Sequence, residues 1–140
     1  MAIKFSKFVI NSNGNDVIDI TEKVKAAILK YGVYDALINI HAPFSSSSIG
    51  VFEYTPDTVE EFLNFSKKII KTKNHHHIKS LIVGNSATVP FIGGEFELDR
   101  FQRILLLDFD DKKRARSVII QIIYWRHLLW KKLKKTNLFY

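Results

Sequence analysis

The sequence predicts a single compact α+β domain in which two main helices pack on a largely antiparallel or mixed sheet of seven or eight strands. Three observations support this prediction. The length of 140 residues is that of one ordinary domain. A content of 46% hydrophobic and 25% charged residues is typical of globular proteins. Two segments with helical spacing come early, and strand-like segments cluster after them, which indicates an α+β arrangement.

The first forty residues predict a strand, a turn and a helix. Residues 3–10 read as a strand with an irregularity between Phe5 and Phe8, where the alternation of apolar and polar positions breaks. Asparagine and glycine residues at 11–16 predict a turn. Apolar residues then recur at helical spacing over 24–31.

Start and stop signals frame this first predicted helix. Asp19 or Thr21 can cap its beginning, and Gly32 stands where a helix is expected to end. Residues 36–41 and 49–54 then predict two strands.

Four consecutive serines, 45–48, separate these two strands. Such a run is either a flexible linker or a packed segment of hydroxyl groups beside a ligand. Because strand-like segments flank it closely on both sides, we favour the packed segment.

The second helix is expected to start at residues 56–58. Thr58 is followed three positions later by Glu61, which matches a capping box. Apolar residues at helical spacing over 59–70 form its buried stripe.

The remaining chain predicts mainly strands. They cover 78–83, 88–92, 95–98 after a hairpin turn at Gly93 and Gly94, 104–109, and 116–125 after a charged turn at 110–113.

Three consecutive histidines precede the strand predicted at 78–83. In an extended segment, His75 and His77 project to one face and His76 to the other. Two imidazoles on one face suit an anion, a proton or a metal ion. The alternative is a solvated loop that happens to contain histidines.

Composition and charge exclude several classes of protein. The chain has no cysteine, which excludes disulfides and thiolate chemistry. No stretch approaches the roughly 20 apolar residues of a membrane span, and the N-terminus does not read as a signal peptide. We therefore expect a cytoplasmic protein.

The positive charge is concentrated at the C-terminus. The net charge is +7, and residues 126–140 contain five lysine or arginine residues and no acid. We therefore divide the chain into a domain at 1–125 and a basic, amphipathic extension at 126–140. The extension can bind nucleic acid or an anionic membrane surface, or it can dock its apolar side on the protein.

Six motifs in order resemble the YjbQ-like family, which is often described as secondary thiamine-phosphate synthases. They are Asp-Ile-Thr at 19–21, Pro-Phe-Ser-Ser at 43–46 followed by Glu53, His-His-His-Ile-Lys at 75–79, Gly-Asn-Ser-Ala-Thr-Val-Pro at 84–90, Phe-Gln-Arg-Ile at 101–104 and Asp-Phe-Asp at 108–110. The resemblance covers roughly residues 3–124.

The resemblance implies a homotrimer with a pocket for a phosphorylated small molecule. The family's reaction joins a thiazole phosphate to a pyrimidine diphosphate, giving thiamine phosphate and pyrophosphate. Such a reaction usually needs a divalent metal, here Zn or Mg, to neutralise charge. Transferred to this sequence, the catalytic residues are His75, His77, Glu53 and Arg103, with His75 and His77 as metal ligands. Ser45, Ser46, Asn85 and Ser86 are then the ligand-binding residues.

One position departs from the family pattern. The histidine of the family's Pro-His-Thr-Thr motif is Phe44 here, and phenylalanine neither binds metal nor moves protons. His41 lies three positions away, and in a strand it points to the opposite face. A non-catalytic paralogue of the same fold is therefore an alternative to an enzyme. For Arg103 and Glu53, a surface ion pair and a solvated carboxylate are the simpler alternatives.

Overall fold

The computed structural model describes residues 1–125, which form three helices and eight strands. The elements in order are β1 (Ala2–Ser12), β2 (Asp16–Asp19), α1 (Thr21–Leu29), β3 (Ala36–His41), β4 (Ser47–Glu53), α2 (Pro56–Ile69), α3 (His75–Val83), β5 (Ser86–Ile92), β6 (Glu95–Phe96), β7 (Gln102–Asp108) and β8 (Arg114–Tyr124). The α+β class and the count of eight strands confirm the sequence-based prediction.

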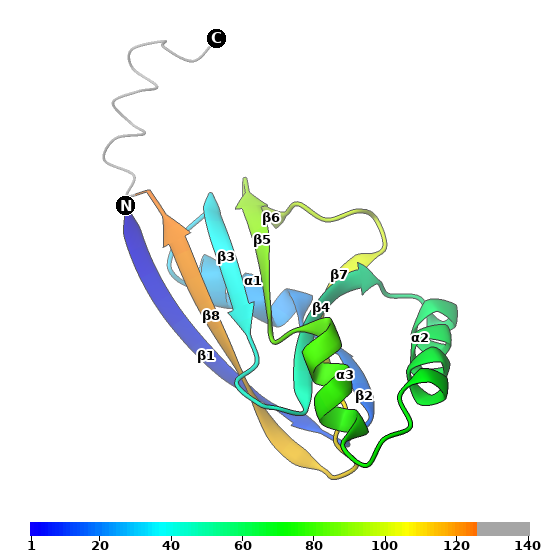
Figure 1. The fold of residues 1–140 in the computed structure, drawn as a ribbon. Coiled ribbons are helices and arrows are strands. Elements are labelled where there is room, and N and C mark those ends of the chain that lie inside the picture. The colour runs from blue at the N-terminus through cyan, green and yellow to red at the C-terminus, as the bar shows by residue number, and fades with distance from the viewer. Residues whose placement is uncertain (126–140) are drawn as a thin grey trace, which may run out of the picture.

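The strands form two sheets and not one. Five strands pair in the order β1-β8-β3-β5-β6, and three pair in the order β2-β7-β4 (Figure 1). Every pairing is antiparallel. The predicted turn at Gly93 and Gly94 joins β5 to β6, as expected.

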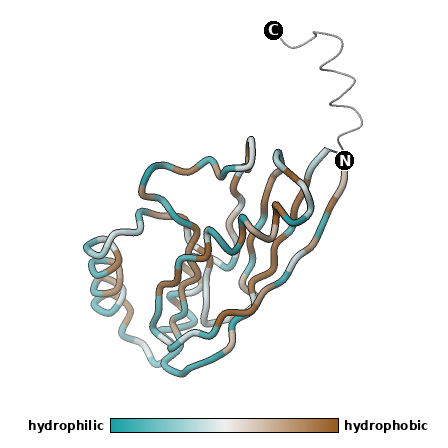
Figure 2. The backbone as a smooth tube through the Cα atoms, turned by 180° about the vertical axis from the view of Figure 1, so that it is seen from behind, coloured by the Kyte–Doolittle hydropathy of each residue, from teal (hydrophilic) through white to brown (hydrophobic). Residues whose placement is uncertain are grey.

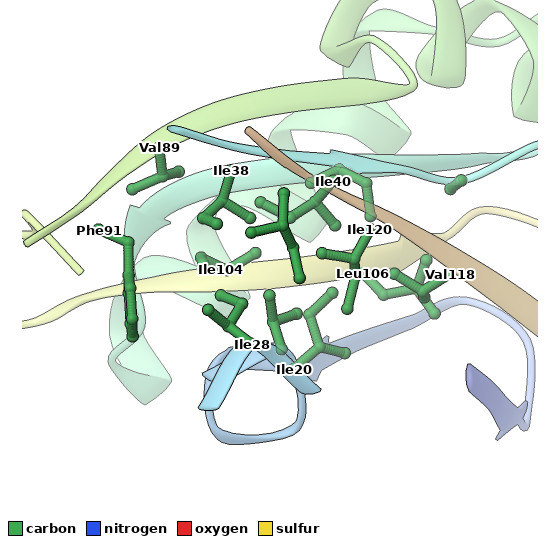
Figure 3. Packing of buried hydrophobic residues seen from close by; sticks show 14 of the residues in the cluster. Ile20, Ile28, Ile38, Ile40, Val89, Phe91, Ile104, Leu106, Val118 and Ile120 are labelled. Atoms are coloured by element: carbon green, nitrogen blue, oxygen red, sulfur yellow. The ribbon is translucent and has the colours of Figure 1, made fainter. Parts of the chain in front are cut away.

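The main core lies between the inner face of the five-stranded sheet and a second layer made of α1 and β7. Ile38 and Ile40 of β3 point toward Ile28 of α1 and Ile104 of β7, and all four side chains are fully buried (Figure 3). Figure 2 shows the same pattern along the backbone, because the apolar segments concentrate in the strands.

A second core lies on the other face of β7. Leu105 and Leu107 alternate with Ile104 and Leu106, and they pack against α2 through Phe62. β7 is therefore buried on both faces, which explains its almost continuous apolar sequence. The resulting layers are the five-stranded sheet, then α1 with the three-stranded sheet, then α2.

The expected irregularity in the first strand is wrong. β1 pairs with β8 without interruption from Ala2 opposite Tyr124 to Ser12 opposite Arg114. The broken pattern has another cause, which is that β1 carries apolar residues on both faces. Phe8 and Ile10 face the core, whereas Phe5 on the outer face is 60% exposed.

The helix ends only partly follow the predictions. The Asp19 carboxylate accepts a hydrogen bond from the Thr21 backbone N–H at 2.9 Å, but Ile20 occupies the N-cap position of α1 and makes no side-chain cap bond, so the cap predicted at Asp19 or Thr21 is wrong. The capping box predicted at Thr58 and Glu61 is wrong. Thr55 caps α2 by accepting from the Thr58 N–H, with Pro56 at the first helical position.

The strand predicted at 78–83 and the extended histidine run are also wrong, because both belong to α3. Short apolar runs do not distinguish a strand from a helix. The helix is favoured here because it buries Ser80 against the serine run. The Ser80 hydroxyl donates to the Ser47 carbonyl at 2.7 Å, and the Ser48 hydroxyl donates to the Ser80 carbonyl at 3.1 Å. Gly84, with a φ of 92°, ends the helix.

Two further expectations, on the C-terminal extension and on membrane spans, concern residues that the structure describes only in part. The C-terminal extension at 126–140 lies beyond the described residues. Within residues 1–125, no helix is long and apolar enough to cross a membrane.

Candidate functional site

A polar pocket of about 530 Å³ opens where three segments distant in sequence meet. The turn between β3 and β4 contributes Phe44 to Ser46, the first turn of α3 contributes His76 and His77, and the loop and strand from Asp110 to Arg116 form the third wall. This pocket brings residues of the serine run and of the histidine run together. The sequence-based prediction placed both runs in one site.

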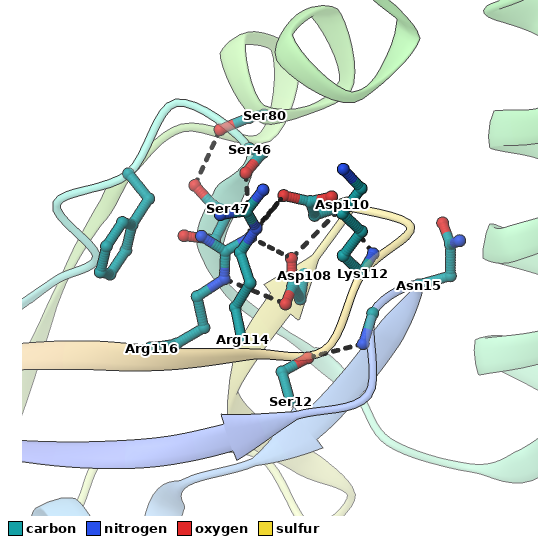
Figure 4. A network of polar contacts seen from close by, with 12 residues as sticks. Ser12, Asn15, Ser46, Ser47, Ser80, Asp108, Asp110, Lys112, Arg114 and Arg116 are labelled. Carbon is teal, nitrogen blue, oxygen red and sulfur yellow. Dashed lines mark hydrogen bonds and ion pairs between the residues drawn. The ribbon is translucent and has the colours of Figure 1, made fainter.

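Arg116 and Asp108 form the buried foundation of the pocket. Their side chains are 3% and 0% exposed, and two hydrogen bonds join them, from Nη2 to Oδ1 at 2.7 Å and from Nε to Oδ2 at 3.0 Å (Figure 4). This fork geometry is the strongest pairing available to a guanidinium and a carboxylate. The ring of Phe44 lies over the same guanidinium, with its centroid 4.9 Å from Cζ.

Ser46 connects this pair to the pocket. Arg116 Nη2 also donates to the Ser46 hydroxyl oxygen at 2.9 Å. Because that oxygen accepts from a cation, the Ser46 hydroxyl hydrogen is left to donate to another group. Ser46 is buried, whereas its neighbour Ser45 is exposed at the pocket wall.

His77 is held in a defined orientation. Its Nδ1 lies 3.1 Å from the backbone carbonyl of Ser45. A carbonyl only accepts hydrogen bonds, so Nδ1 carries the hydrogen and Nε2 of the neutral ring carries the lone pair. His77 is therefore suited to accept a proton from, or when protonated to donate to, a group in the pocket.

The loop after β7 supplies the charged rim. Arg114 Nε lies 2.7 Å from Asp110 Oδ2, and the Lys112 backbone N–H donates to Asp110 Oδ1 at 3.2 Å. Burial alone raises the pKa of Asp110, but these hydrogen bonds and the Arg114 charge outweigh it and hold that pKa below its ordinary value. Asp110 is therefore ionised at neutral pH, and within residues 1–125 the Lys112 ammonium forms no ion pair.

The turn between β1 and β2 fixes the position of this loop. The Asn15 backbone N–H donates to the Asp110 carbonyl at 2.7 Å. Gly14 has a φ of 82°, and a Cβ added there would lie 2.7 Å from the same carbonyl oxygen. Only glycine therefore fits between the two segments.

Asn85 positions the opposite wall and does not face the pocket. Its side-chain nitrogen donates toward the carbonyls of Phe44 at 2.8 Å and Ser47 at 2.9 Å, with Ala42 at 3.3 Å. These bonds hold the turn that carries Ser45 and Ser46. The structure thus gives Asn85 a supporting place behind the predicted ligand-binding serines.

Glu53 and Arg103 lie far from this pocket. They sit at the far ends of β4 and β7, and Glu53 is six residues along β4 from Ser47, a span of roughly 20 Å. Arg103 is half exposed, and its Nε lies 3.6 Å from Asp19 Oδ2. The structure therefore does not bring these two predicted catalytic residues to the histidines.

His75 and Ser86 also lie outside the pocket lining. Residues two apart on a helix point about 200° apart, so α3 separates His75 from His77. The buried Nδ1 of His75 has no hydrogen-bond partner within residues 1–125. Ser86 instead lies with its hydroxyl 2.6 Å from Nδ1 of His41.

The predicted metal site does not fit this arrangement. Its two predicted ligands, His75 and His77, point in different directions from α3. No group of three His, Asp or Glu side chains in the described part of the chain is placed to hold a metal ion. We therefore derive no step through a metal.

Several pocket residues escaped the sequence-based prediction. Asp110, Lys112, Arg114 and Arg116 belong to a segment that reads as a charged turn followed by an apolar strand. A signal was present, because Arg114 and Arg116 stand two apart and therefore share one face of β8. Only the fold shows that this face meets the serine run.

A buried lysine lies beside the site. Lys79 on α3 is 7% exposed. Burial lowers the pKa of its amine, the charge of Lys67 acts in the same direction, and Asp111 at the pocket rim opposes them.

Fold and site together define an α+β domain of two antiparallel sheets with a polar, charged pocket between the serine turn, α3 and the start of β8. The chain belongs to the UPF0047, YjbQ-like family, whose profile matches residues 6–124. It is similar to a UPF0047 protein of Archaeoglobus fulgidus, with 29% identity over 119 residues, covering 77% of this chain and 91% of that protein. A UPF0047 protein of Methanocaldococcus jannaschii is 28% identical over 128 residues, covering 84% and 92%.

Solved structures show the same fold. A structural-genomics target from Clostridium acetobutylicum superposes with a TM-score of 0.80 at 28% identity, covering 86% of this chain and all of that one. A protein of unknown function from Sulfolobus solfataricus superposes with a TM-score of 0.82 at 18% identity, covering 89% and 99%. The family assignment made from six motifs is thus confirmed.

Proposed function

We propose that the pocket binds the phosphate group of a phosphorylated small molecule. The observation that carries this proposal is that Ser46, His77 and Lys112, from three separate segments, line one cavity of about 530 Å³. A cavity of this size suits a small ligand.

The charge balance of the pocket favours a phosphate ester over a highly charged anion. Three cations line it, Lys112, Arg114 and Arg116, together with the carboxylates of Asp110 and Asp111. Arg116 is committed to Asp108, and Arg114 to Asp110, so Lys112 supplies the unpaired charge. The Ser46 hydroxyl then adds a neutral donor, and His77 donates to a phosphate oxygen from Nε2 when its ring is protonated.

Binding can be measured by calorimetry with inorganic phosphate and simple phosphate monoesters at low ionic strength. We expect Lys112→Gln and His77→Gln each to weaken binding about tenfold, the loss expected for one charge-assisted hydrogen bond. Arg103→Gln is the matched control, because it removes a similar cation from outside the pocket. Equal affinity in wild type and Lys112→Gln would refute the proposal.

As the specific reaction of this pocket, we propose the formation of thiamine phosphate. Its support is the family resemblance and the oriented His77, which can transfer a proton as pyrophosphate leaves. Purified protein is incubated with the thiazole phosphate and the pyrimidine diphosphate, with and without Mg or Zn, and pyrophosphate is measured. Turnover that persists unchanged in His77→Gln would exclude this site as its source.

A second candidate is a protein that binds the phosphorylated ligand without turnover. The observation that favours it is the ring of Phe44 stacked on Arg116, where the family carries a histidine. This candidate predicts phosphate binding by wild type together with no pyrophosphate release. Release above that of the His77→Gln variant would contradict it.

The family resemblance also supports assembly as a homotrimer. Ile3, Phe5 and Val9 of β1 expose more than half of their surface on the outer face of the five-stranded sheet. Light scattering after size-exclusion chromatography tests this proposal, and a mass near one chain of 16.2 kDa would reject it.

A further inference from the structure

Two adjoining hollows lie at the corner of the five-stranded sheet where β8 ends. Their volumes are about 520 Å³ and about 290 Å³, and both are lined by Asp35, Tyr124 and Trp125. Tyr34 and Ile92 also line the first hollow. Leu37 lines the second. We call this double hollow the corner groove.

The corner groove is an exposed apolar surface. Trp125 is 71% exposed, Ile92 55%, Tyr34 53% and Leu37 45%. Contiguous exposed apolar surface of this kind marks a place where another segment or molecule packs. None of these residues lines the phosphate pocket, so the groove is a separate feature.

The position of the groove indicates its occupant. The described residues end at Trp125, which is itself a wall of the groove, and residues 126–140 follow it in sequence. The family match ends at residue 124, one residue before this point. A segment attached at the edge of a surface meets it at high effective concentration.

The sequence of the segment matches the chemistry of the groove. Residues 126–140 carry seven apolar or aromatic side chains, at positions 128, 129, 130, 133, 138, 139 and 140. They also carry five cations and no acid. One acid, Asp35, lines both hollows.

We propose that residues 126–140 cover the corner groove of their own chain, with their apolar side chains against Tyr34, Leu37 and Ile92. This contact removes apolar surface from water on both partners and leaves the lysines outside. The extension is thereby an intramolecular cover for a surface that the family domain leaves open.

Hydrogen exchange on the full-length chain tests this proposal. Two amides report on the groove: the Gly94 N–H donates to the Tyr34 carbonyl at 2.9 Å, and the Gly93 N–H donates to the Asp35 carboxylate at 2.9 Å. In Leu129→Ser/Trp130→Ser/Leu133→Ser we expect peptides containing these amides to exchange about tenfold faster, the change expected for a loss of about 1.4 kcal/mol of local stability. Amides of β7 are expected to keep their rates.

A variant with the same number of serine replacements at charged positions separates packing from charge. Lys131→Ser/Lys132→Ser/Lys134→Ser carries the same number of serine replacements, and we expect wild-type exchange at residues 93 and 94. Wild-type exchange in the apolar variant would overturn the proposal, as would protection that requires anionic vesicles or DNA. Protection that rises with protein concentration would assign the groove to a second copy and would also overturn it.

Discussion

Arg116 and Asp108 lie eight residues apart on consecutive strands of different sheets and form a buried, two-point ion pair beneath the phosphate pocket. Arg116 also donates a hydrogen bond to the Ser46 hydroxyl, and the ring of Phe44 stacks on its guanidinium. One guanidinium therefore organises three segments that the sequence keeps far apart.

Breaking this pair is expected to be costly. Asp108→Asn leaves the buried Arg116 charge with only its longer contact to Asp110, at 3.5 Å, and we expect a loss of about 3–5 kcal/mol in the free energy of unfolding. Urea titration followed by circular dichroism measures this loss.

Arg114, two residues before Arg116 in the chain, provides the control for this prediction. Arg114→Gln removes a half-exposed arginine, and we expect a loss of at most about 1 kcal/mol. The double variant Asp108→Asn/Arg116→Gln should lose less than the sum of its single variants, because both members of one pair are removed together. Strict additivity would show that the pair does not act as a unit.

Gly14 is expected to be essential to the shape of the pocket. Gly14→Ala places a Cβ 2.7 Å from the Asp110 carbonyl oxygen at a φ of 82°, so the loop that carries Lys112 must move. We expect weaker phosphate binding by calorimetry and a lower melting temperature.

Gly93→Ala is the matched variant, because Gly93 also has a positive φ, of 61°, but nothing lies within 4 Å of its added Cβ. It should lose only the roughly 1–2 kcal/mol of left-handed strain and keep wild-type phosphate affinity. Equal effects of the two variants on affinity would argue against the loop displacement.

Lys79 is expected to destabilise the fold at neutral pH. Its pKa is lowered in the folded protein, so between that pKa and the unfolded value of about 10.4 the unfolded chain binds more protons. The contribution of Lys79 to stability therefore rises as pH increases through this window.

Lys79→Met keeps the length of the side chain and removes the charge. We expect a higher melting temperature than wild type at pH 7, and a difference that shrinks as pH approaches about 10. Scanning calorimetry at both pH values checks this. A lower melting temperature at pH 7 would mean that attraction to Asp111 outweighs burial.

Phe44 is expected to determine how the pocket responds to pH. Phe44→His places an imidazole at the pocket wall, and a histidine with its ordinary pKa is protonated at pH 6 and neutral at pH 8. We therefore expect the variant to bind phosphate more tightly than wild type at pH 6, with no gain at pH 8.

Phe44→Leu is the companion variant. It keeps an apolar side chain but removes the ring from Arg116, and we expect a loss of about 1–2 kcal/mol in stability with no gain in affinity at either pH. An equal gain in affinity for Phe44→His at pH 6 and pH 8 would exclude protonation as the cause.

The sequence alone determined the fold class, the family and one half of the site. Within residues 1–125, periodicity found seven of the eight strands and two of the three helices, because apolar spacing over long segments reflects which face is buried. The serine run and His77 were found because hydroxyl groups and histidines are conspicuous in sequence. The helix at 75–83 was missed, because its inward residues Lys79 and Ser80 are polar.

Only the tertiary structure decided which residues share the pocket. Glu53 and Arg103 stood in the right motifs, but they occupy the far ends of β4 and β7, and a strand of seven residues separates its ends by roughly 20 Å. Arg116, hidden in an apolar strand, became the centre of the site because antiparallel pairing places the start of β8 beside the turn before β4. That proximity cannot be inferred from the order of residues in the chain.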